Sequence, residues 1–194
     1  IVSERKPEKK QQNINKKNYH LITNEKEIDE WINEAEEAGE LAIDTETSSL
    51  DAHQADLVGI SLSTKIGKAC YIPIGHKFKG CLKKEAVIKK LKPLLEDKSV
   101  KKIGQNIKFD FIVLFKQGII MNSMEDTMLM SYVLDAGKNR HNMDTLSEIH
   151  LQHKTISFKE IVGTGKKEIN FSDVELDKAM EYAAEDADIT YRLY

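Results

Sequence analysis

Over residues 41–50 the sequence reads Leu41-Ala42-Ile43-Asp44-Thr45-Glu46-Thr47-Ser48-Ser49-Leu50, an apolar segment that runs directly into two carboxylates. The segment 41–43 predicts a buried strand. Side chains two apart on a strand point to the same face, so Asp44 and Glu46 should project together from its end. Two like charges held close are unfavourable unless a cation lies between them, and oxygen ligands of this kind suit Mg²⁺ or Mn²⁺. The alternative is that both carboxylates are solvated at the strand end.

Around this strand, the hydrophobic pattern predicts strands first and helices later. We expect further strands at 20–22, 57–63, 69–74 and 100–104, the second and third of these as an antiparallel meander. We expect helices at 24–38, 84–95, 109–117, 126–134, 144–151, 158–162 and 172–194, the last beginning at a capping box formed by Ser172 and Glu175. This order predicts an α/β layer fold with a mixed sheet.

Composition limits the class of protein. The chain has 194 residues, 40% of them hydrophobic and 31% charged, which is typical of a globular domain and excludes collagen-like, coiled-coil and low-complexity chains. Residues 1–18 are polar and lack a hydrophobic period, so we expect a disordered or linker segment there and a folded domain at 19–194. No apolar run approaches the roughly 18 residues of a membrane helix, so we expect no membrane partner.

Net charge, the cysteines and two histidines add three expectations. The net charge of −3 argues against a strongly basic nucleic-acid binder, although an acidic metal site is compatible with such a total. Cys70 and Cys81 match no zinc spacing and no disulfide framework, which favours a reducing, cytoplasmic setting. His150 and His153 have no obvious carboxylate partner, and we expect both on the surface.

A second informative stretch, at a predicted strand-to-helix junction, reads Gly104-Gln105-Asn106-Ile107-Lys108-Phe109-Asp110. Asn106 and Asp110 are four apart, so one helical face would carry an amide and a carboxylate toward the strand ends. The alternative is that Asn106 is only a helix N-cap and Asp110 only a first-turn acid that the helix dipole favours.

The third stretch, in the predicted last helix, reads Tyr182-Ala183-Ala184-Glu185-Asp186-Ala187-Asp188. Tyr182 and Asp186 are also four apart, and the small alanines allow close packing or the approach of a ligand. A phenol and a carboxylate on one face can position a water between them. The alternative is a half-buried tyrosine beside a solvated acidic stripe formed by Glu181, Glu185 and Asp188.

Taken together, D-x-E, N-x-x-x-D and Y-x-x-x-D occur here in an order that resembles the proofreading 3'–5' exonuclease domain of bacterial DNA polymerase I. This is the tyrosine subclass of the four-carboxylate exonucleases. The likeness extends to D-T-E-T-x-S-L-D, G-Q-N-x-K-x-D and Y-A-A-E-D-A-D, and to linking stretches at 92–97, 140–141 and 153–156. It covers about residues 19–194.

The resemblance implies a ribonuclease-H-like α/β fold, a mixed five-stranded sheet flanked by helices. It implies that two divalent ions, Mg²⁺ or Mn²⁺, are held by four carboxylates: Asp44, Glu46, Asp110 and Asp186. Tyr182 would orient the attacking water. The reaction would release nucleoside 5'-monophosphates from the 3' end of single-stranded or frayed DNA.

The resemblance also implies substrate contacts. Leu50 would wedge against the terminal base and Phe158 would stack on a base, although each is alternatively an ordinary core or rim residue. The other residues expected to contact substrate are Thr45, Gln105, Asn106 and Arg140. The partners would be a DNA 3' end and a polymerase domain on the same or another chain, with the protein itself a monomer.

Two departures and two rival interpretations remain. Phe109 stands where the family pattern usually has tyrosine, and nothing here carries polymerase chemistry, so polymerisation is not expected of this chain. One rival is a degenerate, non-catalytic module, against which the intact carboxylates count. The other is an RNA-trimming exonuclease of the same superfamily.

Overall fold

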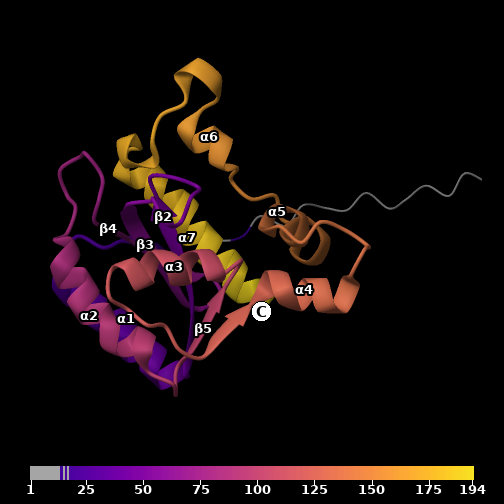
Figure 1. Ribbon diagram of the computed structural model, residues 1–194, viewed down its shortest axis with the longest axis horizontal. Helices are drawn as coiled ribbons and strands as arrows, with labels where there is room; N and C mark the ends of the chain where they lie inside the picture. Colours follow the sequence, from indigo (N-terminus) through magenta and orange to yellow (C-terminus); the bar gives the residue numbers. More distant parts are fainter. Residues whose placement is uncertain (1–13, 15, 17) are drawn as a thin grey trace, which may run out of the picture.

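The computed structural model describes residues 14, 16 and 18–194 (Figure 1). The expected linker at residues 1–18 therefore lies largely outside the described residues. Asn18 already belongs to the first strand, so the expected boundary at residue 19 falls inside that strand.

A mixed sheet forms the centre of the molecule. Its six strands lie in the order β1-β4-β3-β2-β5-β6. The strands β3 and β4 pair antiparallel, as predicted, and β2 also pairs antiparallel with β3. The pairs β1–β4, β2–β5 and β5–β6 are parallel. The strands are β1 (Asn18–Leu21), β2 (Glu40–Thr47), β3 (Leu57–Lys65), β4 (Lys68–Pro73), β5 (Lys101–Gly104) and β6 (Met124–Asp126).

The sixth strand corrects the expected count of five. Strand β6 is only three residues long and carries two acids in the sequence Met-Glu-Asp, so no apolar run marks it. It forms because Met124–Asp126 lies parallel to β5, with Lys102 opposite Met124 and Gly104 opposite Asp126. That pairing is a tertiary contact, which a local hydrophobic pattern does not reveal.

The helices follow the predicted order. They are α1 (Glu25–Ala38), α2 (Lys84–Glu96), α3 (Lys108–Lys116), α4 (Thr127–Asp135), α5 (Met143–Leu146), α6 (Phe158–Val162) and α7 (Leu176–Leu193). A π-helical turn, η1 (Ser147–Leu151), continues α5, and two 3₁₀ turns lie at η2 (Gly165–Lys167) and η3 (Phe171–Asp173). Among the described residues, no helix is both long and apolar enough to cross a membrane.

The expected capping box at the start of α7 is wrong. Ser172 lies inside the turn η3, where its N–H donates to the side chain of Asn170 at 3.0 Å. The helix begins only at Leu176, and Glu175 at its N-cap makes no side-chain capping bond. The Asn170 side chain, two residues before Ser172, thus accepts the Ser172 N–H that Glu175 would have accepted in a capping box.

Helices cover the two faces of the sheet unequally (Figure 1). Ile43 of β2 packs in one core with residues of α1, α2 and α3, among them Ile28, Leu91 and Val113. On the other face the alanines of α7 pack against β1 and β4. Because side chains alternate along β2, the face that carries Asp44 and Glu46 is the one that α7 covers.

Candidate active site

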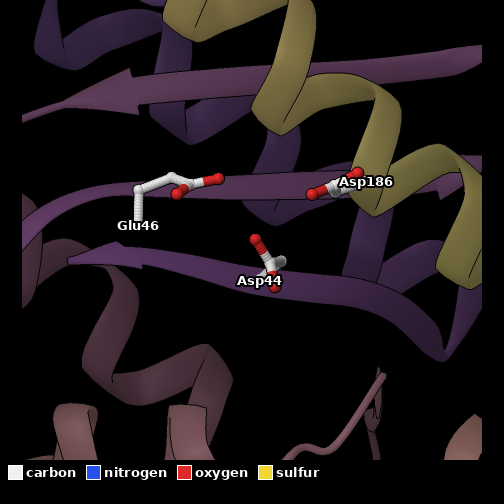
Figure 2. Close-up of side chains that lie close together, drawn as sticks. All are labelled: Asp44, Glu46 and Asp186. Carbon is white, nitrogen blue, oxygen red and sulfur yellow. The ribbon is translucent and has the colours of Figure 1, made fainter. Parts of the chain in front are cut away.

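Three carboxylates converge where β2 passes beneath α7. Ligand oxygens of Asp44, Glu46 and Asp186 all lie within 4.8 Å of one another. Figure 2 shows the three groups pointing into a common space, two from the strand and one from the helix. The structure thus brings together three of the four carboxylates that the sequence nominated.

The electrostatics of this cluster favour a cation. Burial raises the pKa of Asp44 to about 6, and burial followed by the Asp44 charge raises those of Glu46 and Asp186 well above their usual range. Among the described residues, none that lines the surrounding cavity is a lysine, arginine or histidine. Crowded acids, two of them buried and Asp44 half-buried, with no basic group in this lining fit a divalent cation with oxygen ligands.

Asp110, the fourth carboxylate, reaches this region from α3 on the opposite face of the sheet. Its Oδ1 accepts the backbone N–H of Thr45 at 2.9 Å and the Thr45 hydroxyl at 2.6 Å. Burial, then the charge of Asp44, raises its pKa well above the usual range. Thr45, expected to contact substrate, is buried, and both of its donors hold Asp110 in place.

Tyr182 lies one turn before Asp186 on α7, as the spacing predicts. Its hydroxyl hydrogen-bonds to Asp186. Burial, followed by the charges of Asp186, Glu46 and Asp44, raises the pKa of this phenol far above its ordinary value. The hydroxyl therefore keeps its proton at any physiological pH and can form hydrogen bonds, but it cannot serve as a base.

A buried tyrosine packs against the strand position opposite Glu46. Tyr71 of β4 is buried, with its hydroxyl 2.6 Å from Nε2 of His76, whose Nδ1 lies 3.1 Å from the carbonyl of Val174. Gly59, opposite Glu46 in the β2–β3 register, leaves the space for this ring, because a Cβ there would lie 2.0 Å from the Tyr71 hydroxyl. Burial, followed by the charge of Glu46, raises the pKa of Tyr71 well above its usual range, so this hydroxyl lies near the cluster although neither Tyr71 nor His76 lines the cavity.

Asp44, Glu46, Asp186 and Tyr182 line a cavity of about 730 Å³, whereas Asp110 lies outside its lining. Leu50, 90% exposed, and Phe158, 39% exposed, stand at its edge. Asn106 also lines it, but by another geometry than expected: its φ of 60° places it before α3 in the left-handed region. The helical i,i+4 relation with Asp110 therefore does not hold.

Comparison with known proteins settles the family. A family model described as 3'-5' exonuclease matches residues 19–194. This chain belongs to that 3'–5' exonuclease family.

Relatives agree with this assignment. DNA polymerase I of Rhizobium leguminosarum is 46% identical over 188 residues, which cover 86% of this chain and 18% of that protein. DNA polymerase I of Pseudomonas aeruginosa is 43% identical over 182 residues, 91% of this chain and 20% of that protein. The exonuclease chain thus spans about a fifth of the length of these relatives.

A solved structure supports the fold. Trypanosoma brucei RNase D superposes with a TM-score of 0.72 at 15% identity, over 92% of this chain and 64% of that one. The expected ribonuclease-H-like α/β architecture is confirmed, with the sixth strand as the difference.

Two nominated contacts of the exonuclease lie away from the cavity lining. Both ends of the Gln105 amide are engaged: its Nε2 donates to the His141 carbonyl at 2.8 Å, and its Oε1 accepts from the Thr127 hydroxyl at 2.5 Å. Gln105 therefore braces the segment between α4 and α5. Arg140 is exposed in that same segment.

Sequence reasoning missed part of the exonuclease cavity. Phe171 is buried and its ring stacks on Phe158, with centroids 6.1 Å apart and planes within 10°. Asn170 donates to the Ser48 carbonyl at 2.9 Å and so joins the turn η3 to the loop after β2. An isolated phenylalanine within the polar stretch 163–173 is the one local signal that marks this wall. The remaining missed lining residues are Thr47, Ser48, Ser49, Phe109, Met143, Glu168 and Ile169.

Proposed function

We propose that this chain removes nucleoside 5'-monophosphates, one at a time, from the 3' ends of single-stranded or frayed DNA, with two bound Mg²⁺ or Mn²⁺ ions. One observation carries the proposal: Asp44, Glu46 and Asp186 meet within 4.8 Å in the same cavity as Tyr182. Family membership supports the polarity of cleavage. The DNA polymerase I relatives support DNA as the substrate.

The carboxylates would hold the ions. Asp44, Glu46 and Asp186 would contact the ions directly. Asp110 would be the fourth carboxylate ligand, since burial and then the charge of nearby Asp44 raise its pKa. When bound, such ions neutralise the phosphodiester, favour ionisation of the attacking water and stabilise the leaving oxygen. Without them the acidic cavity would repel a phosphodiester, so activity should depend on the metal.

Tyr182 would aim the water. Its hydroxyl proton is committed to Asp186, which leaves the oxygen lone pairs free to accept a hydrogen bond from a water in the cavity. Because the phenol stays protonated, its contribution is orientation for in-line attack, not proton abstraction.

The rim would grip the end of the strand. Leu50 and Phe158 present apolar surface at the cavity edge, and such surface can stack on any base without reading its sequence. The cavity of about 730 Å³ lies within the range of roughly 300–1,000 Å³ that is usual for small-molecule sites, which suits one terminal nucleotide. A base-paired end would have to fray before it entered.

The test uses the purified chain, stripped with EDTA, and a 5'-labelled single-stranded DNA oligonucleotide. We expect no cleavage until Mg²⁺ or Mn²⁺ is added, and then a ladder that shortens one nucleotide at a time. Equal cleavage in EDTA would refute the metal requirement, and immediate release of labelled mononucleotide would refute the polarity. An RNA oligonucleotide of the same sequence decides the sugar preference. The control variant is Asp177→Ala, which removes an exposed acid from α7 outside the cavity.

The setting of this activity is also a proposal. The relatives are about five times longer than this chain, which supports a polymerase domain as its partner on the same polypeptide or another one. Cys70 and Cys81 are both free thiols, which supports a reducing, cytoplasmic location.

A further inference from the structure

Glu185, the neighbour of Asp186, is fully buried and lies outside the cavity lining. Its carboxylate has three donors: Nζ of Lys16 at 2.8 Å, Nε2 of His153 at 2.8 Å and the backbone N–H of Ile156 at 2.7 Å. His153, expected on the surface, is itself buried by this contact. A buried carboxylate is costly unless it is paired and hydrogen-bonded, so this arrangement holds its partners firmly.

Two of these donors belong to the strap, the irregular segment Gln152–Ser157 that joins η1 to α6. Elsewhere the strap is anchored to α5 and η1, because the Thr155 hydroxyl donates to Asp144 at 2.6 Å and the Ser147 hydroxyl donates to the His153 carbonyl at 2.9 Å. The hydrogen bonds from His153 and Ile156 to Glu185 also join the strap to α7.

The strap ends where Phe158 begins. The Phe158 ring stacks on Phe171 and meets the Tyr182 ring edge-on, with centroids 6.1 Å apart and planes at 60°. Two sets of contacts therefore hold the Phe158 ring at the cavity: its aromatic contacts with Phe171 and Tyr182, and the strap that precedes it in the chain.

Adjacent residues on a helix point about 100° apart. On α7 this sends Asp186 toward the carboxylate cluster and Glu185 toward the strap. One turn of α7 thus carries both Asp186, which faces the proposed metal site, and Glu185, which binds the backbone leading to Phe158.

We propose that Glu185 is a positioning residue, which acts through the strap to set Phe158 over the cavity and thereby governs the affinity for the terminal nucleotide. The inference rests on the proposed exonuclease function. It assigns to Glu185 an effect on KM, in contrast to the effect of Asp186 on kcat.

The experiment compares three substitutions on α7 with a single-stranded DNA substrate in Mg²⁺. Glu185→Ala should raise KM about tenfold and change kcat less than about threefold, because Phe158 loses its support while the cluster stays intact. Glu185→Gln keeps an acceptor for the Ile156 N–H and should restore most of the parent KM. Glu181→Ala removes the same charge from an exposed position one turn earlier and should match the parent.

A double variant tests whether Glu185 acts through Phe158. If it does, Glu185→Ala added to Phe158→Ala should raise KM less than about twofold further, because the group that it positions is already gone. Full multiplication of the two single effects would overturn the proposal, and so would a fall in kcat with an unchanged KM.

Hydrogen exchange gives a readout that needs no nuclease activity. The amides of the strap should exchange faster in Glu185→Ala than in the parent or in Glu181→Ala. If Glu185→Ala does not fold, His153→Ala loosens the same tie from the strap side and should speed exchange and raise KM in the same direction. Unchanged exchange in a folded variant would overturn the positioning role. If the parent protein were inactive, only the proposed function would be refuted. Hydrogen exchange would still show whether Glu185 holds the strap in place.

Discussion

The carboxylate cluster and the rim of the cavity are built in different ways. Asp44 and Glu46 stand on the second strand, and Asp186 stands on the longest helix of the described chain. Glu46 and Asp186 are buried and Asp44 is half-buried. Leu50 follows β2 in a loop, and Phe158 opens a helix of five residues. The groups proposed to do chemistry thus stand on long regular elements, whereas the groups proposed to contact the substrate stand on a loop and at the start of a short helix.

This difference assigns separate kinetic effects to the two regions. Changes in the cluster should lower kcat, because they disturb charge stabilisation at the reacting phosphate. Changes at the rim should raise KM, because they weaken contacts with the bases. The predictions on the Asp44, Asp186, Tyr182, Leu50 and Arg140 variants test that division, and one on stability tests the charge crowding within the cluster.

The largest effect should come from Asp44→Ala and Asp186→Ala. Each removes a proposed metal ligand, and loss of preorganised electrostatic stabilisation typically costs about 10²–10³ in rate per group, so we expect at least that fall in kcat. Steady-state rates in saturating Mg²⁺ provide the measurement. Asp177→Ala, which removes an exposed acid from the same helix, should leave kcat unchanged. Near-normal activity in Asp44→Ala would remove it from the ligand set.

A second effect concerns the stability of the metal-free protein. Burial raises the pKa of Asp44 from 3.8 to about 6, so the folded state binds this proton more tightly than the unfolded state. The stability gained by protonating Asp44 is present near pH 4 and is lost as the pH rises through 6. A shift of this size corresponds to at most about 3 kcal/mol. The crowding of Glu46 and Asp186 acts in the same direction.

Thermal unfolding in EDTA checks this expectation. The midpoint should be higher at pH 5 than at pH 7.5, and Mg²⁺ should narrow that gap by stabilising the ionised cluster. Asp44→Asn should raise the midpoint at pH 7.5 in EDTA and weaken its response to Mg²⁺. A midpoint that climbs steadily from pH 5 to pH 7.5 in the metal-free parent would show that these acids do not repel one another as described.

Tyr182→Phe should have a smaller effect than loss of a ligand. It removes the hydroxyl proposed to aim the water but keeps the ring that packs against Phe158 and Phe171. We expect kcat to fall about 10–10²-fold, since misdirected attack costs rate while charge stabilisation survives. KM should hardly change. If Tyr182→Phe proved more damaging than Asp44→Ala, the roles assigned within the cluster would be wrong.

The sequence predicts the cluster well because its signals are local. An apolar run before Asp44, the alternation that aligns Glu46 with it, and the four-residue spacing of Tyr182 and Asp186 are all properties of one element. Each tells which face a side chain occupies. Asp110 shows the limit of such reasoning, because its partner Thr45 lies 65 positions away in the sequence and no spacing links the two.

The rim and its supports are harder to predict for the same reason. His153 was expected on the surface because its partner Glu185 lies 32 positions away, and only the fold brings them together. Gln105 carries the right chemistry for a substrate contact, but its amide is taken by the His141 carbonyl and the Thr127 hydroxyl. Strand β6 and the start of α7 were missed because long-range pairing and a competing cap decided them.

The smallest effects should come from the rim, where two nominated residues can be compared. Leu50 is 90% exposed and lines the cavity, so its side chain is free to meet a base. Stacking of a base on an aromatic side chain is worth about 1–3 kcal/mol, and an aliphatic contact should be worth less, so Leu50→Ala should raise KM about three- to fivefold. Arg140 is exposed outside the cavity lining, and Arg140→Ala should change KM less than about twofold.

The dependence of KM on salt distinguishes a phosphate contact by Arg140 from an apolar contact by Leu50. An arginine that contacts phosphate acts through counterion release, so any effect of Arg140→Ala should shrink as ionic strength rises. The effect of Leu50→Ala should persist, because burial of apolar surface does not depend on screening. KM measured for both variants at low and high salt gives the comparison, with the parent as reference. If Arg140→Ala raised KM more than Leu50→Ala at low salt, the path of the DNA strand would extend over the segment between α4 and α5, and the rim would be wider than the cavity.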